Sequence, residues 1–444
     1  MVNKTLITGF LVLILAFESI AQNSVFSKSE VDIEAMAEKI RTNYGEDSLG
    51  KFYDAYLDYR RYHRALKRLE SYRMSETLDS LQELDLSNCH LTEIPSFAYK
   101  CTNITSLDLS GNTIKELPDE LNHLPKLRKI RLDRNVLSIK KMKVAHLSNI
   151  EEITLKSNEL RTVPRRVKHL KHLKLLDVSY NDLKRVPNRV KRFKDLNSLN
   201  ISGNEGLNQN FKVSRKLPNL EALYASSMQW TLIPEDVYQM TNLKKLIVRE
   251  NKLINISPEI KNLNQLTELS FYKNELSELP VEIFGLTALK ELDLFYNQLK
   301  EIPGEISSLV QMNSLFLAFN QISYLPESLG EMNLKQMFIH HNNLSSLPNS
   351  LSQLDALHTI RFNYNQFTEF PQSILLLKQL TFIDMSNNDI KQIPTELKGM
   401  NELEILSIDK YDNSIDDKIY AEQNEEVLTV LYGRGVNVNF GDPD

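Results

Sequence analysis

Leucine and a few other apolar residues recur along most of the chain in one pattern, L-x-x-L-x-L-x-x-N-x-L-x-x-L-P. The segment from Leu289 to Pro303 is a representative unit. Leu292 and Leu294 alternate with Asp293, which is the period of two expected of a β-strand with one buried face. Leu299 and Ile302 follow after a turn and return to the same interior. Each unit therefore predicts a short strand, a turn and a return segment.

The asparagine of this pattern marks the register of the repeat. The corresponding position falls on Cys89, Asn112, Asn135, Asn158, Asn181, Asn204, Met228, Asn251, Asn274, Asn297, Asn320, Asn342, Asn365 and Asn388. Its spacing is 23 residues, apart from one step of 24 and one of 22. Self-similarity at a fixed period is typical of a solenoid. A carboxamide can both donate and accept hydrogen bonds, so we expect successive asparagines to satisfy the buried turns as a ladder.

This pattern, with its L-P-x-x-I continuation at 279–283, resembles the leucine-rich-repeat family in its 23-residue form over residues 81 to about 408. The resemblance implies an α/β repeat solenoid, a curved horseshoe with a parallel β-sheet on the concave face and short helical or 3₁₀ segments outside. We assign residues 81–410 to the solenoid, with about 15 repeats because an incomplete unit starts at Leu403. The family has many unrelated partners, so the fold alone does not give the function.

Each end of such a solenoid needs a cap that covers the apolar interior. Residues 23–80 are predicted to form a helical amino-terminal cap, with two helices divided near 45–50. Residues 411–444 are predicted to form the carboxy-terminal cap, with a helix around 425–431 and a last strand around 436–440. This piece is too short to hold a catalytic domain.

The first residues differ from the rest of the chain. Lys4 precedes an almost wholly apolar run from Leu6 to Phe17, and the small residues Ser19 and Ala21 come before Gln22. An apolar run of this length is typical of a signal peptide and short for a membrane span. We predict a signal peptide over residues 1–22 and a secreted or cell-envelope location; an uncleaved anchor is the alternative. No later segment is apolar for long enough to cross a membrane.

One stretch departs from the repeat. Met228 replaces the ladder asparagine in the 24-residue unit, Trp230 replaces a leucine, and residues 205–217 lack the L-P pair. We interpret residues 204–230 as an irregular seam. It is an insertion tolerated on the outer face, a change of curvature or the site of a bound partner.

Composition and motifs give little sign of enzymatic chemistry. The net charge of −5 shows no general attraction to nucleic acid, and no P-loop, nucleophile elbow or zinc-protease motif occurs. Cys89 and Cys101 fall on core positions of the repeat, where we expect buried structural thiols; a disulfide between them is the alternative. His340, His341 and His358 are the best metal-ligand candidates, but no cysteine or carboxylate set completes a coordination shell. We predict no enzymatic activity and no cofactor.

The side chains between and just after the strand leucines are predicted to face the concave side. In the later repeats these positions are rich in aromatic residues, the type enriched at binding hot spots. The predicted partner-binding residues are Tyr224, Tyr272, Phe295, Tyr296, Phe316, Phe319, Phe338, His340, His341, Arg361 and Tyr364. The alternative is that these rings only pack on one another along the sheet.

Repeats three to five instead carry basic residues on this face. They are Arg128, Lys129, Arg131, Arg134 and Lys156, within residues 126–194, which hold 21 basic and 6 acidic residues. This stretch is either a solvated surface or a site for an acidic partner.

The sequence as a whole predicts a non-enzymatic module that binds a protein through its concave face, outside the cytoplasm. A binder of polysaccharide or cell-envelope glycan is the alternative. We expect no nucleic-acid partner and favour a monomer.

Overall fold

The computed structural model describes residues 60, 63–75, 77–137, 149–163, 170–185, 193–211, 217–409 and 415–441. The chain divides into two compact units, residues 1–71 and 72–444. In the first unit, the described residues 60 and 63–71 are helical. The predicted signal peptide and most of the predicted amino-terminal cap lie outside the described residues.

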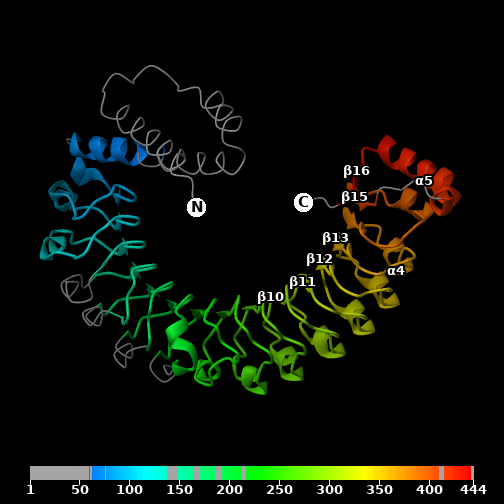
Figure 1. Ribbon diagram of the computed structural model, residues 1–444, viewed down its shortest axis with the longest axis horizontal. Coiled ribbons are helices and arrows are strands. Elements are labelled where there is room, and N and C mark those ends of the chain that lie inside the picture. The colour runs from blue at the N-terminus through cyan, green and yellow to red at the C-terminus, as the bar shows by residue number, and fades with distance from the viewer. Residues whose placement is uncertain are drawn as a thin grey trace, which may run out of the picture. The chain divides into compact units, whose positions relative to one another are not determined.

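The described part of the second unit contains one parallel sheet of 16 strands, in which every strand pairs with the next one along the chain (Figure 1). The strands are short: β1 Glu83–Asp85, β2 Ser106–Asp108, β3 Lys129–Arg131, β4 Glu152–Thr154, β5 Leu175–Asp177, β6 Ser198–Asn200, β7 Ala222–Tyr224, β8 Lys245–Ile247, β9 Glu268–Ser270, β10 Glu291–Asp293, β11 Ser314–Phe316, β12 Gln336–Phe338, β13 Thr359–Arg361, β14 Phe382–Asp384, β15 Ile405–Ile408 and β16 Asn437–Phe440. Their register places leucine beside leucine, as in the pairing of Leu292 with Leu269.

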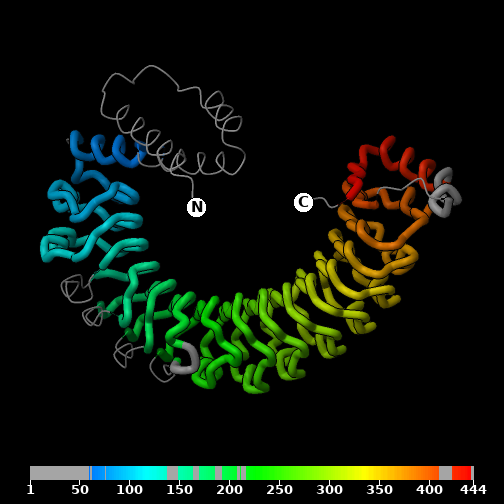
Figure 2. The backbone as a smooth tube through the Cα atoms, in the orientation of Figure 1, coloured from blue at the N-terminus to red at the C-terminus, as the bar shows by residue number. Residues whose placement is uncertain are grey.

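Short 3₁₀ or α-helical segments connect the strands on the outer side of the coils. They are η1 Leu78–Ser80, η2 Ser96–Lys100, η3 Asp119–His123, η6 Glu205–Asn210, η8 Val237–Gln239, η9 Pro258–Asn262, η10 Val281–Gly285, η11 Gly304–Ser308, η12 Glu327–Glu331, η13 Asn349–Gln353, α4 Gln372–Leu375 and η14 Thr395–Gly399. Within the second unit the backbone forms a regular arc (Figure 2), and the strands lie on its inner side (Figure 1). This confirms the predicted curved solenoid with a parallel sheet on its concave face.

The repeated apolar positions form one continuous interior. In the representative unit Leu292, Leu294 and Leu299 are fully buried, and Ile302 is 1% exposed. Pro303 follows in an extended conformation, directly before η11. Its fixed φ starts the outer segment, where no sheet hydrogen bond is needed.

The ladder of asparagines is present as predicted. The Asn297 side-chain Nδ2 donates to the Leu294 carbonyl of its own coil at 3.1 Å and to the Phe271 carbonyl of the preceding coil at 3.0 Å. Its Oδ1 accepts the Leu276 backbone N–H at 3.1 Å. One carboxamide thus satisfies backbone groups of two adjacent turns that would otherwise be buried without partners.

The two exceptions to the ladder are apolar. Cys89 is 5% exposed and Met228 is fully buried. Cys89 and Cys101 are buried free thiols, so no disulfide joins them. In the irregular seam the interior is filled by larger rings, with Phe211 and Trp230 centroids 6.0 Å apart.

The carboxy-terminal end closes with α5, Ile415–Gly433, and with β16. The predicted helix is confirmed and begins earlier than its expected range. Val436 and Val438 are buried, whereas Phe440 on the last strand is 41% exposed.

Candidate partner-binding face

The residue before the ladder position has a left-handed backbone in every one of the fourteen coils, with φ between 51° and 68°. Glycine occupies this position only at Gly111 and Gly203. All other coils place an ordinary side chain there, at a cost of roughly 1–2 kcal/mol per residue. This conformation turns the residue away from the interior and towards the concave side.

Four of these left-handed residues carry rings that stack in one column. Ring centroids are 4.0 Å apart between Tyr296 and Phe319, 3.9 Å between Phe319 and His341, and 4.0 Å between His341 and Tyr364. The interplanar angles are 11°, 17° and 22°, so the faces of adjacent rings lie against each other. We call these four residues the ring column.

Five further rings adjoin the ring column. Phe316 and Phe338 are parallel with centroids 5.3 Å apart, and Phe295 meets Phe316 edge to face at 5.5 Å. His340 contacts the Phe295 ring at 5.7 Å, and Tyr272 contacts the Tyr296 ring at 5.4 Å. We call the nine rings the aromatic platform: Tyr272, Phe295, Tyr296, Phe316, Phe319, Phe338, His340, His341 and Tyr364.

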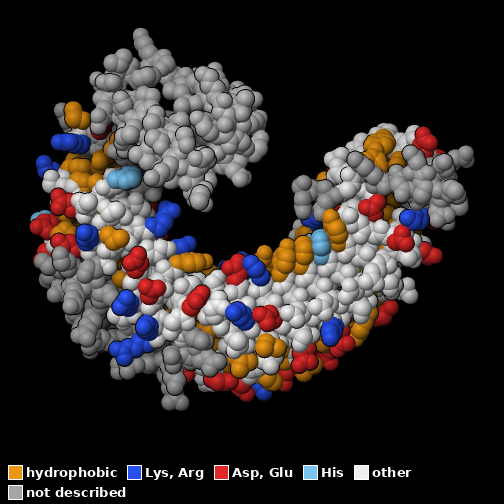
Figure 3. Space-filling model, in the orientation of Figure 1, with side chains coloured by type: hydrophobic (Ala, Val, Ile, Leu, Met, Phe, Trp, Pro, Cys, Tyr) orange, Lys and Arg blue, Asp and Glu red, His pale blue; other side chains and the backbone are white. Residues whose placement is uncertain are grey.

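The platform rings lie on the inner side of the sheet. Leu294, Leu317 and Ile339, which are each next in sequence to a platform residue, are fully buried in the interior. Tyr296 and Tyr364 remain 40% and 36% exposed, and His340 is 7% exposed. Figure 3 shows apolar side chains and a histidine gathered along this inner side. The rings pack on one another and still present an accessible surface.

Two of the predicted residues lie beside or apart from the platform. Arg361 makes a charged hydrogen bond through Nε to Asp384 Oδ2 at 3.1 Å. Tyr224 lies on β7, two strands before Tyr272, and its ring faces Lys245 Nζ at 5.9 Å.

Sequence reasoning missed Tyr180, which occupies the same repeat position as the ring column. It directly precedes Asn181, so the ladder register could have found it. Its ring is 48% exposed, with Lys156 Nζ 4.7 Å from the centroid. On the next coil Gly203 leaves room for the ring, because a Cβ there would lie 2.6 Å from a Tyr180 ring carbon.

Burial governs the electrostatics of His340. Its pKa falls to about 3, first because burial disfavours the charged imidazole and then because of the positive charges of Arg361 and His341. His340 is therefore neutral at physiological pH, and the platform gains no charge from it.

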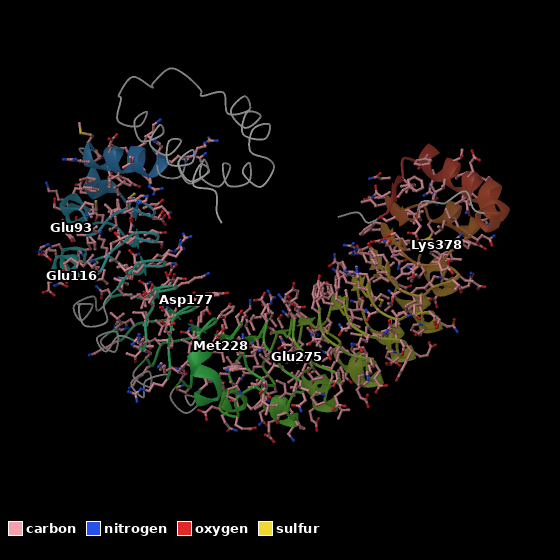
Figure 4. The ribbon with its side chains drawn as sticks, viewed as in Figure 1. Glu93, Glu116, Asp177, Met228, Glu275 and Lys378 are labelled. Carbon is pink, nitrogen blue, oxygen red and sulfur yellow. The ribbon has the colours of Figure 1, made fainter. Side chains whose placement is uncertain are left out.

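The basic residues of the earlier repeats face carboxylates. Arg128 Nε is 3.6 Å from Glu151, Lys129 Nζ is 2.8 Å from Glu152, and Arg131 is 3.7 Å from Asp108. Acidic side chains also project on this side, such as Asp177, whereas Glu93 and Glu116 lie on the outer side (Figure 4). These pairs are exposed and weak, but they offset the basic charge on the concave face.

A separate hollow of about 330 Å³ lies beside the irregular seam, which contributes Phe211 to its lining. The buried rings of Phe211 and Tyr238 line it, together with Leu232, which is 49% exposed. Burial raises the pKa of Tyr238 above its ordinary value, so its hydroxyl stays protonated. This hollow is consistent with the interpretation of the seam as the site of a bound partner.

The described ranges lack two further features. No group of three or more His, Cys, Asp or Glu side chains there is arranged to hold a metal ion. The same ranges contain no helix with the length and apolar character needed to cross a bilayer.

Comparisons with known proteins agree with the solenoid fold. The leucine rich repeat model matches residues 79–137, 241–299 and 265–322. A leucine-rich-repeat protein of Leptospira interrogans is 26% identical, with a TM-score of 0.68, and the match covers 84% of this chain and 98% of that one. No curated protein sequence matches the chain.

Two more distant structures share the fold. An internalin of Listeria monocytogenes is 20% identical, with a TM-score of 0.58, over 73% of this chain and 94% of that one. A chain of the Toll–Spatzle complex of Drosophila is also 20% identical, with a TM-score of 0.59, over 72% of this chain and 46% of that one.

Proposed function

We propose that this chain, which belongs to the leucine-rich-repeat family, is a non-enzymatic module that binds a protein partner through the aromatic platform. The ring column carries the proposal. Four rings are held in left-handed backbone positions, and two of them are more than a third exposed. The left-handed backbone is common to all coils, so the exposed aromatic surface is what distinguishes this column. Exposed aromatic surface costs free energy, and such patches mark interaction sites.

The geometry of the column favours a protein over a glycan. Sugar rings stack on free aromatic faces, whereas the faces within this column are covered by neighbouring rings at 3.9–4.0 Å. What the column presents is ring edges, which carry the positive part of the aromatic quadrupole. Ring edges suit carbonyl oxygens and the faces of other aromatic side chains, both of which a protein surface provides.

A partner of protein size also matches the dimensions. The platform extends over five coils, from β9 to β13, and strands lie about 4.8 Å apart, so it spans roughly 20 Å. The Toll structure, which shares the fold, was determined in complex with Spatzle. The amino-terminal sequence supports action outside the cytoplasm, as a secreted or cell-envelope protein.

The test is affinity capture with the mature chain, followed by a binding curve for the captured protein. The variant replaces Tyr296, Phe319 and Phe338 together by alanine and is expected to abolish binding. A matched control replaces Val281, Tyr324 and Leu376 by alanine, since these are 55%, 52% and 65% exposed away from the platform. The control is expected to bind normally.

Both variants should keep the circular dichroism spectrum of the parent chain. Retained affinity in the platform variant would contradict the proposal. A glycan array that binds the parent chain but not the platform variant, beside an empty protein capture, would support the polysaccharide alternative instead.

A further inference from the structure

Two polar side chains lie together at the carboxy-terminal margin of the platform. His340 follows β12 and Asn363 follows β13, and the two coils are joined there by the His341 N–H donating to the Asn363 carbonyl at 3.0 Å. Phe362 is fully buried in the interior. By strand alternation Asn363 therefore faces the concave side, as His340 does.

Both side chains contain buried polar atoms that have no hydrogen-bond partner among the described residues. Asn363 is fully buried, and neither its Nδ2 nor its Oδ1 has a partner among the described residues. His340 Nδ1 likewise has none. The next coil shows the ordinary solution, because the buried Ser386 Oγ donates to Asp384 Oδ1 at 2.8 Å. Buried polar groups are nearly always satisfied, so the exceptions call for a missing partner.

The hydrogen-bonding groups of His340 and Asn363 indicate which chemical group would satisfy them. A carboxamide offers a donor and an acceptor, and a neutral imidazole offers one of each. The nearby charges of Arg361 and Asp384 are bonded to each other. A charged ligand group would therefore be buried without a counter-ion, which is costly. A neutral group that both donates and accepts is the complement.

We propose that His340 and Asn363 form a hydrogen-bonding subsite for an amide of the protein partner, either a main-chain amide or an Asn or Gln carboxamide. This inference rests on the proposed function, because the subsite adjoins the aromatic platform. Access requires a rotamer change of neighbouring side chains, which is common at protein interfaces. Arg361 lies on the same face and two residues from Asn363, so its side chain is the first that would move.

The first test is the stability of Asn363→Leu, which replaces the carboxamide by an apolar group of similar shape. Because the parent side chain is unsatisfied, the variant is expected to raise the Tm by about 2 °C. A lower Tm would overturn the inference, since it would mean that the amide is already bonded within the fold. Ser179→Ala is the matched control: Ser179 occupies the same repeat position and is also buried with an unpartnered hydroxyl.

The second test measures binding of N-acetylglutamine methylamide by NMR, through the side-chain amide resonances of asparagine in the full mature chain. A saturable shift of the Asn363 signal is expected, and Asn363→Leu should weaken binding by about tenfold. Ser179→Ala should leave it unchanged. Equal binding of acetate, or tighter binding of glucose, would overturn the amide assignment.

The two proposals fail separately. If the platform variant loses its protein partner while the amide probe ignores Asn363, only the subsite is wrong. If the amide probe binds as expected but the platform variant keeps its partner, the proposed function is wrong.

Discussion

The inner sheet face has two regions built on the same backbone. From β3 to β7 it carries mainly charged and small side chains, with the separate rings of Tyr180 and Tyr224, and from β9 to β13 it carries the aromatic platform. Tyr180 and Tyr296 occupy the same left-handed position in the two regions. Tyr180 has Gly203 beside it, whereas Tyr296 is stacked on Phe319.

The comparison shows which positions the fold controls. The leucine interior and the asparagine ladder are alike in both regions, so they are requirements of folding. The outward positions carry different residues in the two regions without any change in strand pairing, so folding does not constrain the residue type there. Their content therefore carries information about binding. Four predictions test this separation, and the first concerns what the regions share.

Asn181→Ala and Asn297→Ala should each destabilise the chain strongly. Asn181 accepts the backbone N–H groups of Asn158 and Leu160 at 2.9 Å, and its loss leaves buried groups unpaired, as does the loss of Asn297. Each substitution is expected to cost about 3 kcal/mol or more. Urea unfolding followed by circular dichroism measures it. A cost below about 1 kcal/mol at either position would contradict the shared role of the ladder.

Gly203→Ala should destabilise the first region. The new Cβ would lie 2.6 Å from the Tyr180 ring, so the ring must move, at about 1–3 kcal/mol, and the left-handed backbone of Gly203 adds roughly 1–2 kcal/mol of strain. Adding Tyr180→Ala should recover the part due to the ring in a double-mutant cycle. Ser227→Ala, at the next left-handed position, is the control with no expected effect. Lack of recovery in the double variant would assign the cost to the backbone.

The stability losses caused by Tyr180→Gly and Tyr296→Gly should differ by about 0.5–1.5 kcal/mol. Glycine relieves the left-handed strain at both positions, which offsets its cost in the unfolded chain. Only Tyr296 also loses ring stacking, worth about 0.5–1.5 kcal/mol. Thermal unfolding should place Tyr180→Gly above Tyr296→Gly. The reverse order would show that the ring column does not stabilise the fold.

Asp133→Asn should raise the free energy of unfolding by about 0.5 kcal/mol at pH 7, which is the smallest of the four effects. Burial raises the pKa of the Asp133 carboxyl above its ordinary 3.8, and the charges of Asp177 and Asp108 raise it further. The folded chain thus binds this proton more tightly than the unfolded chain, so stability falls as pH rises through the window above 3.8. The gain should vanish below that pH. A gain that is constant from pH 3 to 7 would exclude this cause.

The fold followed from the sequence because each structural requirement repeats with a fixed period. Leu292 and Asn297 are each one instance of a signal seen in coil after coil, so the interior, the ladder and the sheet could all be predicted. Strand alternation also gave the side on which Phe316 and Phe338 lie.

The contacts within the site could not be predicted in the same way. The left-handed position before the ladder residue accepts Ser, Glu, Lys, Tyr and His alike, so no consensus reveals it. Stacking of Tyr296 on Phe319 depends on that backbone conformation and on side-chain rotamers. The burial of Asn363 depends on the side chains around it, which no single repeat contains.

The ring column couples the recognition surface to the curvature of the coil stack. Its centroids are 3.9–4.0 Å apart, closer than the roughly 4.8 Å between adjacent strands, because side chains on an inner radius converge. Flattening the arc would open gaps between these rings while the sheet hydrogen bonds stay nearly unchanged. A ligand that wedges the rings apart must therefore straighten this segment, and one that clamps their edges must bend it further.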